Sequence, residues 1–186
     1  MTMELGMLIL QVTIGLLLAG HGAQKLFGAF DGPGLEGVAG FMEKLGLRPG
    51  HQWALMAGVS EFFGGLLTAL GFFHPIGPLM TIAAMAVATH KVHAGKPIWV
   101  ASGGAELPVT NMAIATTMLV AGPGKLSFDK IFGTRAPLWL VGLVLGGIGY
   151  GLYNAINPSE ETQQRILETA ERAVEVVRER IPGIAA

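Results

Sequence analysis

The chain contains no cysteine, and this absence removes whole classes of chemistry. Without thiols it cannot form a disulfide, ligate an iron–sulfur cluster through cysteine, or build a thiolate zinc site. The absence does not indicate a compartment, because such a chain is compatible with any redox environment. The sequence also contains no motif for a flavin or an iron–sulfur centre of its own, so electron transfer by this protein would need a bound redox-active molecule or a cofactor of a partner protein.

Charged residues are also scarce. They make up 13% of the 186 residues, whereas hydrophobic residues make up 51%. Soluble domains carry about a quarter of charged residues, so the deficit indicates that much of the chain faces lipid. The formal net charge of −1 gives no electrostatic reason to expect a nucleic-acid partner.

Five apolar runs predict an all-α fold, an integral membrane helical bundle. A helix needs about 20 residues to cross about 30 Å of hydrocarbon, and the first, second and fifth runs are long enough. The third and fourth are long enough only if their polar flanks enter the membrane zone facing protein rather than lipid. In chain order, the runs are Leu5–Ala23, Trp53–Phe73, Ile76–Thr89, Leu107–Ala121 and Pro137–Ile156.

These runs divide the chain into three parts. We expect a four-helix membrane core in residues 1–133, a fifth transmembrane helix in residues 134–157, and a cytoplasmic amphipathic helix in residues 158–186. Asn157 and Pro158 suit the start of that last helix. Residues 31–50 also contain an amphipathic helical pattern, which is either a helix on the membrane surface or a packed connector.

Glycines in the fifth run are spaced for close helix packing. Gly142 and Gly146 are four residues apart, as are Gly147 and Gly151. This spacing lets two helices approach closely, so we expect the fifth run to pack against a helix of this chain or of a second copy. A homo-oligomer is therefore one candidate assembly.

Lysine and arginine gather on one side of the expected membrane. The positive-inside rule makes that side cytoplasmic, so in a cell inner (plasma) membrane we predict the N-terminus outside and the C-terminus in the cytoplasm. Trp53 and Trp99 lie where an interfacial belt of aromatic residues is expected. The basic residues of the cytoplasmic side are Lys25, Lys44, Arg48, Lys91, Lys96 and Arg165, against Lys125, Lys130 and Arg135 on the other.

Strongly polar residues fall at the cytoplasmic end of all four core spans. Spans that alternate in direction bring these segments together, so we predict one polar pocket. An unpaired charge would cost a few kcal/mol at membrane depth, and residues three or four apart share a helix face. The predicted pocket residues are His21, Gln24, Lys25, Glu61, His90, His93 and Glu106.

Each of these residues also has a structural interpretation. Glu61 and Lys25 would hold two helices together as an ion pair, or Lys25 would instead extend to the interface. His21 and Gln24 would hydrogen-bond a neighbouring helix. Glu106 would stabilise the positive N-terminal end of the fourth helix.

The same set of side chains suits the headgroup of a quinone or a small anion. Lysine and histidine supply donors for quinone oxygens, and histidine and glutamate can relay protons. A haem between two histidines, or a divalent metal held by His and Glu, uses the same residue types. No spacing specifies either of them, and we predict no metal site.

Three segments resemble the DoxX family of membrane proteins. They are HGAQKLFGAFDGPGLEGVAGFMEKLGL, SEFFGGLLTALGF and HAGKP…GGAELP, within a resemblance over about residues 5–125. The family takes its name from a membrane subunit of a thiosulfate:quinone oxidoreductase. The resemblance therefore implies a four-helix membrane core and a place in quinone-linked or sulfur-linked redox chemistry. It supplies no catalytic residues, and Leu107 stands where the family pattern leads us to expect an aromatic residue.

Three functions are compatible with these observations. The first is a redox membrane subunit that uses the polar pocket together with a soluble partner subunit. The second is a non-catalytic scaffold that recruits soluble partners through the tail, and the third is a small-solute carrier. The sequence leaves open whether the protein is an enzyme.

Overall fold

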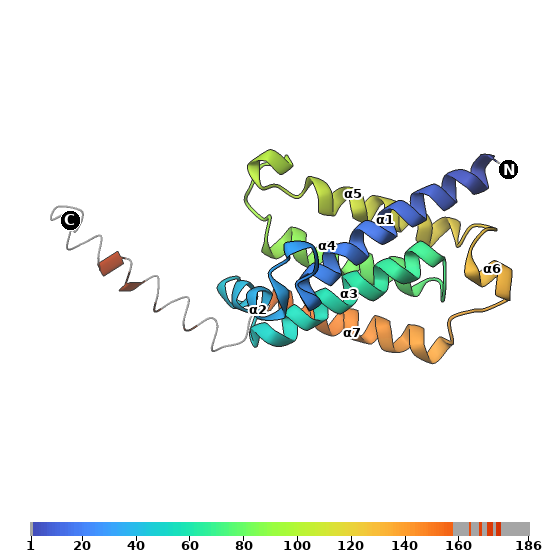
Figure 1. Cartoon of the computed structure of the whole chain (residues 1–186). Coiled ribbons are helices and arrows are strands. Elements are labelled where there is room, and N and C mark those ends of the chain that lie inside the picture. Colours follow the sequence, from blue (N-terminus) through green and yellow to red (C-terminus); the bar gives the residue numbers. More distant parts are fainter. Residues whose placement is uncertain (1, 158–163, 165–167, 169–170, 173, 176–186) are drawn as a thin grey trace.

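The structure of this protein, a computed structural model, describes residues 2–157, 164, 168, 171–172 and 174–175. The helix expected in residues 158–186 lies largely outside the described residues. Within the described part, every regular element is helical (Figure 1). The elements are α1 (Thr2–Phe27), η1 (Ala29–Asp31), α2 (Gly34–Lys44), α3 (Gly50–Leu70), α4 (Ile76–Lys91), η2 (Val100–Ser102), α5 (Glu106–Ala121), α6 (Phe128–Phe132) and α7 (Leu138–Ile156).

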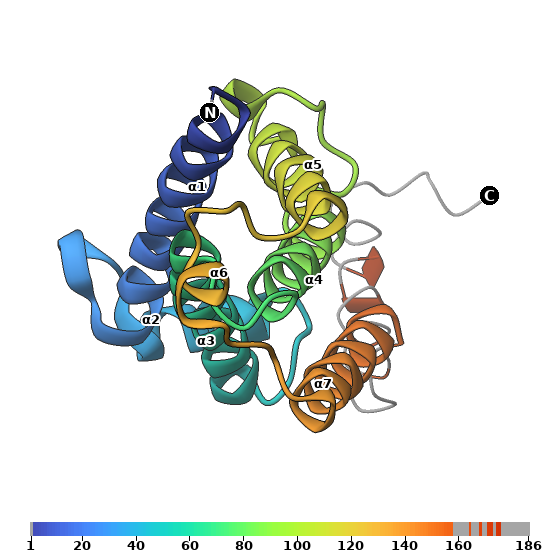
Figure 2. The ribbon, with the colours of Figure 1, turned by 90° about the vertical axis from the view of Figure 1, so that its right-hand side faces the viewer.

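The long helices run alongside one another as a bundle. Helix α1 packs on α3, α3 on α4 and α4 on α5, and α7 lies against α4 on the outside (Figure 2). Short elements cover the two ends (Figure 1). The α2 end holds α2 and the connection between α4 and α5. The α6 end holds α6, the tight turn between α3 and α4, and the N-terminus.

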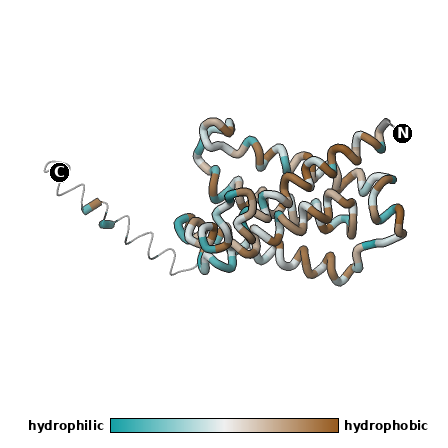
Figure 3. Tube along the Cα trace, in the orientation of Figure 1, coloured by the Kyte–Doolittle hydropathy of each residue, from teal (hydrophilic) through white to brown (hydrophobic). Residues whose placement is uncertain are grey.

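Three helices are long and apolar enough to cross a membrane. They comprise Met3–Phe27, Gly50–Leu70 and Leu138–Ile156, so the chain is a multi-pass membrane protein by its helix composition. Helices α4 and α5 have 16 residues each, which is about 24 Å at 1.5 Å per residue. The helices between the two ends are mostly apolar, and hydrophilic residues are concentrated at the α2 end (Figure 3).

Glycines allow α1 and α3 to approach closely. A Cβ atom at Gly15 would lie 2.5 Å from the backbone nitrogen of Ala69, and one at Gly65 would lie 2.5 Å from that of Ala19. A Cβ at Gly22 would collide with the backbone of Phe62. Small residues at such positions are typical of membrane helix pairs, where packing rather than hydrophobicity drives association.

The glycines of α7 contribute less to packing within the chain than their spacing indicated. Gly151 meets the side chain of Met56, but Gly142, Gly146 and Gly147 have no described atom within 4 Å of an added Cβ. The expected contact of this helix with another helix is therefore made through its last turns, where Gly151 and Ala155 are buried. The remaining glycines lie on surface that the described residues leave open.

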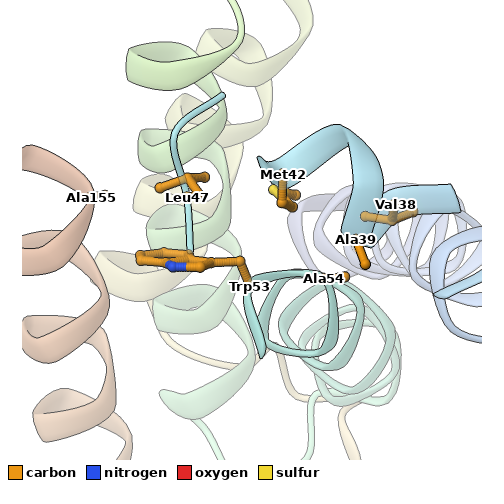
Figure 4. Packing of buried hydrophobic residues seen from close by; sticks show 7 residues of the cluster. All are labelled: Val38, Ala39, Met42, Leu47, Trp53, Ala54 and Ala155. Atoms are coloured by element: carbon orange, nitrogen blue, oxygen red, sulfur yellow. The ribbon is translucent and has the colours of Figure 1, made fainter. Parts of the chain in front are cut away.

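The connector helix α2 is packed against the protein. Val38, Ala39 and Met42 form its buried face and belong to a cluster with Trp53 and Ala54 of α3. Of the two interpretations of residues 31–50, the structure supports the packed connector. The belt assignment of Trp53 was wrong, because its indole is buried next to Leu47, with Ala155 of α7 nearby (Figure 4). Trp99 is exposed.

Candidate functional site

A buried ion pair joins α1 to α3. The Lys25 ammonium donates a hydrogen bond to Oε2 of Glu61. Glu61 is only 6% exposed and lies eleven residues after the start of α3, about 16 Å along its axis. The carboxylate is therefore deep within a candidate membrane helix, where a charge needs a partner.

The geometry of α1 directs Lys25 towards the bundle interior. Helical side chains lean towards the N-terminus of their helix, and the N-terminus of α1 lies at the α6 end (Figure 1). Close packing also holds the two helices at this level, because Leu26 and the Cβ of Lys25 lie against Gly58 of α3. Lys25 thus reaches inward to Glu61 instead of extending to the interface, and its side chain keeps a relative exposure of 25%.

His21 and Gln24 lie on α1 just before Lys25. Nδ1 of His21 is 3.2 Å from Oε1 of Gln24. Gln24 is half-buried, while His21 is exposed. The two side chains support each other and place donors one turn of helix from the ion pair.

His93 and Glu106 organise the connection between α4 and α5. Nδ1 of His93 donates to the carbonyl oxygen of Gly103 at 2.7 Å, which leaves its Nε2 as the acceptor nitrogen when the ring is neutral. The Glu106 carboxylate accepts from the backbone N–H of Val100 at 2.8 Å. Both residues therefore order this connection, and Glu106 also begins α5 as expected.

The polar residues expected in one pocket are held in two groups at the α2 end. One group contains His21, Gln24, Lys25 and Glu61, and the other contains His93 and Glu106. Among the described residues, the hydrogen bonds and ion pairs of these side chains do not link one group to the other. His90 is exposed. That all seven share a single pocket stays a prediction.

A second buried carboxylate, which the sequence analysis did not single out, lies at the α6 end. Asp129 of α6 is 7% exposed. Its carboxylate accepts from the backbone N–H groups of Phe73 and His74, at 3.0 and 2.8 Å, and from the Thr134 hydroxyl at 2.6 Å. Ser127 caps the start of α6 by accepting from the N–H of Lys130. Ser127, a residue type that commonly caps helices, was the available signal for α6, but nothing in the sequence indicated the backbone groups that Asp129 would bind.

A small cavity also lies at the α6 end, beside the turn between α3 and α4. Its volume is about 20 Å³, and the polar side chains among its mostly apolar lining residues are Gln11, Thr68 and His74. Burial lowers the pKa of His74, although the charge of Asp129 and a hydrogen bond with the backbone of Leu119 oppose this effect. The ring is therefore neutral at physiological pH.

Metal binding finds no support in the described part of the chain, where no group of three or more His, Asp or Glu side chains could hold an ion. The arrangement at Lys25 and Glu61 instead offers a cationic donor next to a carboxylate that can exchange a proton. Such a pair can bind and polarise an acceptor oxygen, which is a property of quinone and oxyanion sites.

The comparisons with known proteins locate one family domain. Residues 6–94 match the DoxX family. Comparison with curated proteins gave no match, and comparison with solved structures gave none. The matched region begins in α1 and ends after α4, so it contains His21, Lys25, Glu61 and His93 but stops before Glu106 and α5. Over residues 6–94, this membrane protein carries a DoxX family domain.

Proposed function

We propose that this protein is the membrane subunit of a redox system and that it binds a quinone headgroup at the α2 end. The observation that carries the proposal is the ion pair between Lys25 and Glu61. Intramembrane charges are costly, and where they occur they commonly mark a binding or proton-transfer site. The partial exposure of Lys25, with exposed His21 one turn away, leaves donors within reach of a ligand.

The chemistry assigns separate roles to these side chains. Lys25 donates to one oxygen of the headgroup. Oε1 of Gln24 accepts from the Nδ1–H of His21 and holds this ring in place, so His21 donates from Nε2 to the other oxygen when the ring is protonated. Glu61 and Lys25 exchange protons with the bound oxygen. Reduction of a quinone to a quinol takes two protons and two electrons, and the electrons come from a redox cofactor of a soluble partner subunit.

The proposed topology places this partner on the cytoplasmic side. In this topology the core consists of α1, α3, α4 and α5, with α7 as the fifth transmembrane helix and the tail on the cytoplasmic side. The distribution of lysine and arginine supports a cytoplasmic location for the α2 end. The connection between α4 and α5, with His90, His93 and Glu106, then forms the cytoplasmic rim of the site.

Binding of decylubiquinone to the purified protein in nanodiscs tests this proposal. We expect saturable binding to the wild type and a loss of affinity of at least about tenfold in Lys25→Gln, the loss of one hydrogen bond to a charged group. The matched control is Lys125→Gln, because Lys125 is 81% exposed and lies at the α6 end. Its affinity should equal that of the wild type.

Two results would contradict the proposal. Equal affinities in the wild type and Lys25→Gln would remove the site from the α2 end. Absence of decylubiquinone binding to the wild type, with saturable binding of thiosulfate that depends on Lys25, would replace the quinone by a sulfur oxyanion.

A further inference from the structure

The cavity at the α6 end is a meeting point of the core helices. Gln11 comes from α1, Thr68 from α3, Pro78 from α4 and Met118 from α5, and the turn residue His74 completes the polar lining. A volume of about 20 Å³ is close to the minimum that holds one water molecule. None of the seven polar residues predicted at the α2 end lines this cavity.

Thr68 stands out among the threonines of these helices. Its hydroxyl is buried and has no hydrogen-bond partner among the described residues. Other helical threonines donate to the carbonyl four residues earlier, as Thr81 does to Gly77 at 3.0 Å and Thr89 to Met85 at 2.8 Å. The Thr68 hydroxyl therefore makes no such bond to its own helix, and it lies close to α4, where a Cβ at Gly77 would be 2.6 Å from Oγ1. Leaving it unsatisfied would cost about 1–3 kcal/mol.

Gln11 presents an amide to the same space. It is only 4% exposed, inside a candidate membrane helix. Its Nε2 lies 3.4 Å from the place that a Cβ at Gly71 would occupy. Gly71 ends α3 with a φ of 58°, a conformation that glycine adopts without strain. A Cβ there would lie 2.5 Å from the Cβ of Ser127, so the missing side chain lets Ser127 pack close to the amide.

We propose that this cavity is a binding site for one ordered water molecule, held by the Thr68 hydroxyl and the Gln11 amide with His74 at its edge. All three side chains both donate and accept hydrogen bonds. They form an uncharged site, and two to four polar partners are what a buried water needs. The site is independent of the proposed quinone site.

The sign of a stability change tests this proposal. Thr68→Val keeps the shape of the side chain and removes its hydroxyl. If water is bound, the variant loses a hydrogen bond and its unfolding midpoint in detergent falls by about 2–4 °C. If the hydroxyl is unsatisfied, its removal relieves a cost and the midpoint rises. Thr81→Val is the matched control, because Thr81 is also buried. Its hydroxyl bonds the carbonyl four residues earlier in its own helix, a contact that does not stabilise a helix, so we expect little change.

The unfolding midpoint of Gln11→Met gives an independent test, because Gln11 lines the cavity from α1 whereas Thr68 lines it from α3. With water bound, its midpoint should also fall, and a rise in both variants would overturn the proposal. An experimental structure that resolves ordered water should show density within hydrogen-bonding distance of Thr68 Oγ1 and the Gln11 amide. An empty cavity in such a structure would equally overturn it.

Discussion

Glu61 and Asp129 are both carboxylates buried inside the protein, but the chain stabilises them differently. Asp129 accepts from two backbone N–H groups and a hydroxyl, which occupy both of its oxygens. Glu61 pairs through one oxygen with a lysine that is itself partly exposed. Asp129, with both oxygens hydrogen-bonded, holds a turn in place. Oε1 of Glu61 accepts no hydrogen bond from the residues that the structure describes, and in the proposed function this carboxylate exchanges a proton with the ligand. Partner number, more than burial, separates a structural carboxylate from a candidate functional one.

The largest loss of stability should come from a variant that separates α1 from α3, the helices that carry Lys25 and Glu61. Gly22→Ala would place a Cβ against the backbone of Phe62. Backbone atoms cannot move aside as a side chain can, so we expect a loss above the usual 1–3 kcal/mol or so of overpacking. Gly20→Ala is the matched control, because a Cβ there meets nothing within 4 Å. Thermal unfolding in detergent measures both variants, and equal midpoints would show that the close approach is not needed.

The next largest loss of stability should come from breaking the ion pair between Lys25 and Glu61. Lys25→Met leaves Glu61 buried without a cation, which should cost about 3–5 kcal/mol of unfolding free energy. The double variant Lys25→Met/Glu61→Met removes both charges and should recover most of this loss. Unfolding of the four members of this mutant cycle gives the coupling directly. Equal losses in the single and double variants would mean that Lys25 acts by packing alone.

Removal of the Asp129 carboxylate should lower the stability by a smaller amount. Asp129→Ala leaves the N–H groups of Phe73 and His74 without their acceptor, at an expected cost of about 2–3 kcal/mol. Quinone binding at the α2 end should be unchanged, because Asp129 lies at the opposite end. Exposed Asp31 provides the control, and Asp31→Asn should unfold like the wild type, because asparagine tolerates the positive φ of 58° at this position. Loss of quinone binding in Asp129→Ala would contradict the assignment of a structural role.

The smallest predicted effect is the change of stability with pH that His74 contributes. Its folded-state pKa lies below the ordinary value of 6.5, chiefly because of burial. The unfolded chain therefore binds a proton more readily, and stability contributed by the neutral ring is lost as pH falls below 6.5 towards the folded-state pKa. Because the ring is only half-buried, solvent screening keeps this contribution small. His74→Gln should show a shallower loss of unfolding midpoint between pH 7.5 and 5.5. Parallel curves for the two proteins would contradict this role.

The sequence indicated the three candidate membrane helices, α1, α3 and α7, because their hydrophobic length directly reflects the thickness of the bilayer. It also indicated the partners of the ion pair, since Glu61 within an apolar run requires a nearby cation. The position of Trp53 could not be obtained in this way, because a tryptophan near the end of a span suits both an interface and a core. Only the arrival of α2 and α7 beside it determines that it is buried.

The α6 end was harder to anticipate for a similar reason. Asp129 and the turn that it stabilises are 55 and 56 residues apart in the chain, and no periodic pattern connects them. Gln11 and Thr68 each resemble the isolated polar residues that membrane helices tolerate. Their common cavity depends on the packing of α1 against α3, which the glycine contacts determine.

The sequence separation of Asp129 from its turn has a consequence for the order of synthesis. The N–H groups of Phe73 and His74 leave the ribosome well before Asp129 does, whereas Lys25 precedes Glu61 by 36 residues. The link between α1 and α3 can thus form during translation while the turn still awaits its acceptor. A nascent chain stopped before α6 would have the first helix pair assembled and the opposite end unfinished.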